Sequence, residues 1–163
     1  MSLFLYGLNP KNETGKYFEA SIHQREPITC MLYMVNEVHK KEKGEYLISQ
    51  DVAYFGPMFG EGVPSGSTCE KLAECIEQFI SIFPEEIKFP IVNEHIAHYY
   101  CSRKDNVFIV ETCYRPDSFM GRIFLTAKAI DPDNEKDITS KATLEDVLAF
   151  VDFLRNCGGF EVD

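Results

Sequence analysis

Two segments of the chain carry apolar side chains at helical spacing on one side only, and this pattern constrains the fold more than any other feature. A one-sided helix buries its stripe against another layer, because short helices are marginal alone in water. The sequence therefore predicts two helices that cover one face of a second layer. Their stripes are Leu72, Ile76, Phe79, Ile80 and Phe83 in the first helix, and Leu144, Val147, Leu148, Val151 and Leu154 in the second.

Capping residues predict where the first helix begins and ends. Ser67 is the expected N-cap, and Glu70, three residues later, completes a capping box. Pro84 is expected to stop the helix, because proline cannot continue the hydrogen-bond ladder.

The second helix has its own end signals. Thr143 is the expected N-cap, with Asp146 at the position of the capping carboxylate. Gly158 and Gly159 are expected to end the helix, and Phe160 is placed to pack back on its last turn.

The second layer is predicted from segments with strand patterns. Residues 17–23 alternate between apolar and polar side chains, which predicts a half-buried strand. Residues 28–38, after Pro27, are apolar on both faces and predict a central strand. A turn at Gly44 is expected to join this strand to a return strand in a hairpin. Hairpins imply an antiparallel sheet, so the predicted class is α+β: a two-layer fold with a mainly antiparallel sheet of about five or six strands and two amphipathic helices on one face. The length fits a single domain over residues 1–163. The expected strands are residues 17–23, 28–38, 46–55, 106–115 and 119–130.

Charge excludes several classes of function. The chain has 26 acidic and 16 basic residues, and its formal net charge is −10. Such a surface repels phosphate backbones and anionic lipids, so we expect no nucleic-acid partner and no membrane role. An acidic surface suits a basic protein partner. The first residues lack the pattern of a signal peptide, which predicts a cytoplasmic location.

Six cysteines occur, and none forms a CxxC pair. Most lie in apolar segments, which favours small buried hydrophobic side chains in a reducing compartment. A disulfide framework is the open alternative.

The stretch EHIAHYYC, residues 94–101, places four metal-capable side chains close together. On a helix, His95, His98 and Cys101 would form a three-ligand zinc site with an open catalytic position, and Glu94 would act as a base. The alternative is that these residues are ordinary packing or surface side chains, because a strand would separate the two histidines.

A glycine-rich loop, residues 60–68, leads into the first helix. Free backbone N–H groups at Gly66, Ser67 and Thr68 would hold an anion or small ligand. No lysine follows Gly66, and Glu61 would repel phosphate, so the phosphate-loop pattern is not met. The alternative is a turn followed by a helix cap.

Two segments give a faint resemblance to a known group. The loop that leads into CEKLAECIEQF and the end of the second helix, FLRNCGGFEV, look like small bacterial and phage-type proteins of unknown function. The resemblance implies no activity, cofactor or partner.

The sequence favours an acidic cytoplasmic protein-interaction module of the immunity or regulatory type, without catalytic activity and without a cofactor. Acidic residues would steer association, aromatic anchors would supply affinity, and the exposed sheet face would be the docking surface. A homodimer through that face is also open. The alternative function is a small metal-dependent hydrolase that uses the zinc cluster of residues 94–101.

Overall fold

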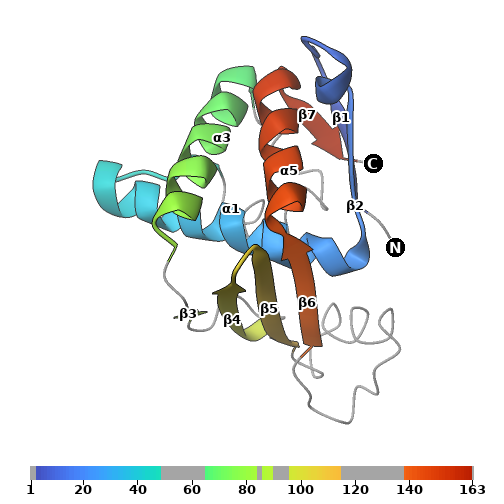
Figure 1. The fold of residues 1–163 in the computed structure, drawn as a ribbon. Helices are drawn as coiled ribbons and strands as arrows, with labels where there is room; N and C mark the ends of the chain where they lie inside the picture. The colour runs from blue at the N-terminus through green and yellow to red at the C-terminus, as the bar shows by residue number, and fades with distance from the viewer. Residues whose placement is uncertain (1–2, 49–64, 84–85, 90–95, 115–137, 163) are drawn as a thin grey trace.

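The computed structural model describes residues 3–48, 65–83, 86–89, 96–114 and 138–162. In this part of the chain the fold is α+β, as predicted, with long helices and antiparallel sheets (Figure 1). The single sheet of five or six strands is wrong, because the strands form two separate sheets.

The smaller sheet joins the two ends of the described chain. It contains β1 (Leu3–Gly7), β2 (Tyr17–Ala20) and β7 (Phe160–Val162) in the order β2-β1-β7, and both pairings are antiparallel. The predicted strand at residues 17–23 is confirmed as far as Ala20, and its burial alternates as expected.

The larger sheet has four strands in the order β3-β4-β5-β6, all antiparallel. The predicted strand at residues 106–115 is confirmed as β5, and the predicted strand at residues 119–130 lies outside the described residues. The bounds are β3 (Glu86–Phe89), β4 (Ile96–Lys104), β5 (Val107–Tyr114) and β6 (Ile138–Thr143).

The predicted central strand at residues 28–38 is wrong, since this segment belongs to helix α1 (Ile22–Lys43). Ser21 caps the helix in a capping box with Gln24, and Pro27 lies inside the helix. The predicted turn at Gly44 is the left-handed C-cap of α1, so no hairpin connects it to a return strand. Residues 46–48 are not in a strand, and residues 49–55 lie outside the described chain.

Helix α1 is buried on every side over three turns. Every residue from Arg25 to Asn36 is buried, including four polar residues. The helix packs against β5 and β6 on one side and against α3 (Gly66–Ser81) and α5 (Leu144–Asn156) on another (Figure 1). A helix inserted in the core replaces the predicted arrangement in which two helices alone cover a sheet.

Helices α3 and α5 confirm the two predicted amphipathic helices, and they pack side by side (Figure 1). The N-cap of α3 is Ser65, so the predicted cap at Ser67 is wrong by two residues. The capping box of Thr143 and Asp146 on α5 is confirmed. Leu148, predicted to be buried, is 37% exposed.

The end of α5 follows its predicted design. Gly158 and Gly159 have positive φ angles of 65° and 94°, and the ring of Phe160 packs against the ring of Phe153 at 6.0 Å. Among the described helices, none combines the length and apolar character that a membrane span requires.

The loop between β1 and β2 docks on the end of α5. Backbone N–H groups of Leu8, Asn9 and Lys11 donate to the carbonyl oxygens of Gly159, Cys157 and Asn156, respectively. Gly15 permits this approach, because a Cβ atom there would lie 1.9 Å from the Asn156 carbonyl oxygen. An ion pair between Lys11 and Glu70 ties the same loop to α3.

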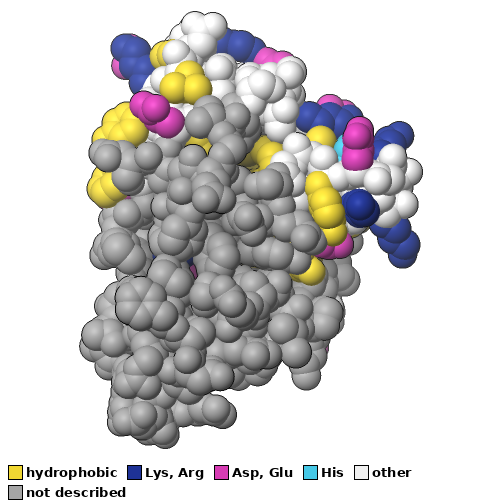
Figure 2. All heavy atoms as spheres, turned by 180° about the vertical axis from the view of Figure 1, so that it is seen from behind, with side chains coloured by type: hydrophobic (Ala, Val, Ile, Leu, Met, Phe, Trp, Pro, Cys, Tyr) yellow, Lys and Arg dark blue, Asp and Glu magenta, His cyan; other side chains and the backbone are white. Residues whose placement is uncertain are grey.

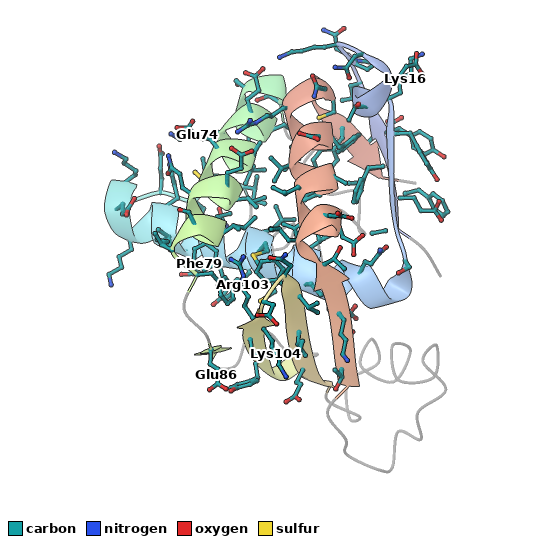
Figure 3. All side chains as sticks on the ribbon, in the orientation of Figure 1. Lys16, Glu74, Phe79, Glu86, Arg103 and Lys104 are labelled. Atoms are coloured by element: carbon teal, nitrogen blue, oxygen red, sulfur yellow. The ribbon has the colours of Figure 1, made fainter. Side chains whose placement is uncertain are left out.

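Arg103 connects the larger sheet to α3. Its Nη1 donates to the carbonyl oxygen of Ile80 at 2.9 Å, near the end of the helix, and its guanidinium lies 5.1 Å from the centre of the Phe108 ring. Figure 3 shows the side chain between β4 and the lower end of α3. A cation at a helix C-terminus is favourable because the last carbonyl groups carry partial negative charge.

Candidate functional site

The zinc hypothesis depended on a helix over residues 94–101. From Ile96 onward the chain is strand β4, and its pairing with β5 runs regularly from His98 to Cys101. Positions three apart alternate between the two faces of a strand, so the helical spacing that suggested the site is absent. Glu94 and His95 lie outside the described residues.

Cys101 is fully buried and faces the core, where its sulfur contacts the thiol of Cys30 on α1. This contact, together with burial, raises the pKa of Cys30, so the Cys30 thiol stays protonated. Within the described segments no three ligating side chains meet. The zinc hypothesis stays a prediction: one equivalent of zinc in protein purified without a His tag, lost in His98→Ala, would support it.

The anion hypothesis named Gly66, Ser67 and Thr68, which form the first turn of α3. The cap at Ser65 already occupies part of this site, since its Oγ accepts from the Thr68 N–H and contacts the hydroxyl groups of Ser67 and Thr68. A backbone bridge between Ser65 and Gly159 lies beside the same turn. The geometry is that of a satisfied helix cap, and anion binding stays a prediction.

A small cavity of about 110 Å³ lies between the last turns of α1 and α3. His39 borders it, and His39 Nδ1 donates to the carbonyl oxygen of Glu45 at 2.7 Å. Cys75 also borders it, and burial raises the pKa of that thiol, so the thiol is not an activated nucleophile. The apolar lining is Val35, Val38, Phe79 and Ile82.

The outer face of the smaller sheet is the feature that sequence reasoning missed. Phe4 and Tyr6 on β1 and Tyr17 on β2 share this face, and Tyr6 and Tyr17 are 39% and 42% exposed. The Tyr17 ring lies 6.0 Å from the Phe4 ring and 5.4 Å from the Tyr6 ring. Figure 2 shows hydrophobic side chains at the surface on the side of the molecule where β1 and β2 lie.

Carboxylates flank these rings on both neighbouring strands. Glu19 on β2 is paired in register with Phe4, and Glu161 on β7 is paired with Tyr6, so both belong to the same face. Both glutamates are exposed. We call this group the aromatic face: Phe4, Tyr6, Tyr17, Glu19 and Glu161.

Tyr17 and Glu19 interact directly. The Tyr17 hydroxyl donates to Glu19 Oε2 at 3.2 Å, and desolvation together with this carboxylate raises the pKa of Tyr17. Lys16, which directly precedes β2, forms an ion pair with Glu13 at 2.5 Å (Figure 3). The aromatic face therefore offers π surfaces and negative charge together.

The opposite face of the same sheet explains why these rings are left in solvent. Leu5 is fully buried, and the Phe18 ring packs on Phe150 and Phe153 of α5 at 5.2 and 5.8 Å. Alternation along a strand then places Phe4, Tyr6 and Tyr17 outward. The alternation was visible in YFEA, residues 17–20, but the partner strand LFLYG was not recognised, because it has aromatic or aliphatic residues at both parities.

No protein-family model, curated protein or solved structure matches this chain.

Proposed function

We propose that this chain is a non-enzymatic protein-binding module of the immunity or regulatory type, acting in the cytoplasm, that docks a basic protein segment on the aromatic face. The observation that carries the proposal is the group of three contacting aromatic rings between two exposed carboxylates, Glu19 and Glu161.

The chemistry of the face selects the partner. An arginine or lysine side chain is attracted to the face of a tyrosine ring, and a guanidinium also pairs with carboxylates in two-point fashion. Tyrosine is enriched among the residues that dominate binding energy at protein interfaces. The net charge of −10 would add long-range attraction for the same partner.

The edge of the sheet offers a second element of recognition. Strand β2 pairs only with β1 in the described sheet, so its other side presents backbone groups that an extended segment of the partner can pair with. The proposed occupant is thus an extended, arginine- or lysine-containing segment alongside β2, with its basic side chains over Tyr6 and Tyr17.

Affinity capture with the wild-type chain, followed by binding measurements on two matched variants, tests this proposal. The face variant is Tyr6→Ser with Tyr17→Ser, and the control variant is Val38→Ser with Ile82→Ser at the α1–α3 cavity. Like the face variant, the control removes two exposed hydrophobic side chains. Val38 is 42% exposed and Ile82 is 75% exposed. Proteins enriched by the wild-type chain are then produced singly, and their dissociation constants are measured at low and high salt.

We expect a basic partner whose affinity falls at least about 10-fold for the face variant, is unchanged for the control variant and weakens with salt. Glu19→Lys with Glu161→Lys should weaken binding further. A partner that binds the face variant as well as the wild type would contradict the proposal, and loss in the control variant alone would move the site to the cavity. Self-association lost in the face variant would show that the occupant is a second copy.

A further inference from the structure

The beginning of α3 and the end of α5 bring two cysteines together in the core. Cys69 lies in the first turns of α3, and Cys157 is the C-cap of α5. Both are 0% exposed, and the two thiols lie close enough that each shifts the pKa of the other, while the Cys157 Sγ also donates to the Leu154 carbonyl oxygen at 3.5 Å. The backbone N–H of Gly159 also faces both sulfur atoms.

The backbones around the two cysteines are already in contact. Ser65 forms a β-bridge with Gly159, and a Cβ atom at Gly66 would lie 3.2 Å from the Cα of Gly158. A disulfide needs Cα atoms within roughly 7 Å and Cβ atoms that face each other. The interacting thiols and the backbone contacts beside them place both cysteines where a disulfide needs only a small backbone adjustment.

The second pair of contacting thiols provides an internal comparison. Cys30 also contacts Cys101, but Cys30 lies in the middle of α1, where every neighbouring position is buried. Cys157, in contrast, precedes the Gly158–Gly159 turn, and Glu70 next to Cys69 is exposed. Helix ends open locally more easily than buried helix centres, so an oxidant reaches the Cys69–Cys157 pair first.

We propose that Cys69 and Cys157 form a reversible disulfide by exchange with a small disulfide of the glutathione class. The Cys157 thiolate attacks one sulfur of that disulfide, breaks its S–S bond and releases one small thiolate. Cys69 then loses its proton to solvent, attacks the mixed disulfide on Cys157 and releases the second thiolate. Two protein thiols are oxidised, and one small disulfide is reduced to two thiols.

The environment assigns the attacking role to Cys157. The hydrogen bond from Cys69, followed by the one from the Gly159 N–H, lowers the pKa of the Cys157 thiol. The same contact and burial raise the pKa of Cys69, which suits the thiol that acts second.

The bond would join the two ends of a long segment, from residue 69 to residue 157. It would also fix the end of α5 on which the β1–β2 loop docks, since Asn9 donates to the Cys157 carbonyl oxygen at 3.0 Å. Closing a loop of this size restricts the unfolded chain strongly, and for a domain of this length the melting temperature should rise by about 10 °C.

The experiment equilibrates the folded full chain with mixtures of reduced and oxidised glutathione, blocks free thiols with an alkylating agent and maps the peptides by mass spectrometry. We expect a peptide pair linked through Cys69 and Cys157 that disappears on adding reductant. Its formation should coincide with the rise in melting temperature, while the far- and near-ultraviolet circular dichroism stays native.

Three alanine variants complete the design. Cys69→Ala and Cys157→Ala should abolish both the linked peptide and the thermal shift, and Cys75→Ala, a partly buried thiol outside the pair, should keep both. If the first two variants do not fold, the wild-type peptide map alone decides. Oxidised glutathione that yields only mixed disulfides, or links Cys30 to Cys101 first, would overturn the proposal.

Discussion

Helix α1 is buried on all sides, whereas helix α5 is exposed to water on one side. This difference explains why only α5 could be predicted from the sequence. In α5 buried and exposed residues alternate with the helical period, so a stripe is visible in the sequence. In α1 twelve consecutive positions, Arg25 to Asn36, are buried, so no stripe exists. A hydrophobic period appears in the sequence only where one side of a helix is exposed to water, so a fully buried helix gives no such pattern.

The ends of the two helices, in contrast, look alike. Ser21 and Gln24 form the same capping box at the start of α1 that Thr143 and Asp146 form at the start of α5. Lysines in the last turn and the left-handed Gly44 also mark the end of α1. Capping residues are recognisable even in a fully buried helix, because they satisfy backbone groups at the helix end and do not depend on which face is exposed to water.

The largest expected difference between the two helices concerns their leucines. Leu32→Ala in α1 removes a side chain that is 1% exposed and should lower the free energy of unfolding by about 3 kcal/mol. Leu148→Ala in α5 removes one that is 37% exposed and should cost less than about 1 kcal/mol. Urea denaturation measures both. Equal losses would contradict the central position of α1.

A buried polar residue of α1 should be nearly as sensitive. Asn36 is 1% exposed, its Oδ1 accepts from the N–H groups of Leu47 and Ile48, and its Nδ2 donates to the Ile48 carbonyl oxygen. Asn36→Leu keeps the volume but leaves these backbone groups without partners, so we expect a loss of about 2 kcal/mol. Asn156→Leu, at the partly exposed end of α5, is the control and should cost less. A neutral Asn36→Leu would show that water replaces the side chain.

Alkaline pH should sharpen the same contrast. The pKa of Cys30 on α1 is raised by its contact with Cys101 and by burial, so the folded state retains a proton that the unfolded state loses. Its contribution is complete below the thiol pKa of the unfolded chain, near 8.5, and falls by about 1.4 kcal/mol per pH unit above it until the folded-state pKa is reached. Cys30→Ala should flatten the decline in unfolding free energy measured between about pH 9 and pH 10.5 by this amount. An unchanged slope would exclude Cys30 as its source.

The smallest difference should lie between the two caps. Ser21→Ala and Thr143→Ala each remove a side-chain acceptor at the first turn, and each should cost about 1 kcal/mol. Chemical denaturation of the two single variants measures this directly. A much larger loss for Ser21→Ala would mean that the start of α1 is constrained by more than its cap.

The fold was predictable from sequence where elements meet water on one face. Helices α3 and α5, strand β5 and the alternation in β2 were recognised for that reason. The division into two sheets was not, because strands β1 and β7 are short and pair across the whole chain. Local patterns carry no information on such distant pairing.

The aromatic face could not be predicted from the sequence. The expected docking surface was the exposed face of one large sheet, whereas the residues of the aromatic face come from β1, β2 and β7 of the smaller sheet together. The zinc cluster was predicted from helical spacing, but the chain from Ile96 onward is a strand. In the predicted anion site at Gly66 to Thr68, the Thr68 N–H already donates to the Ser65 cap.

The pairing of β1 with β7 has a consequence for the growing polypeptide. Tyr6 and Tyr17 are translated long before Glu161, which lies far downstream in the sequence. A nascent chain that has passed β2 but not β7 presents the rings without the third strand and without one of the two flanking carboxylates. Binding of the proposed kind therefore requires that β7 has been translated and has paired with β1.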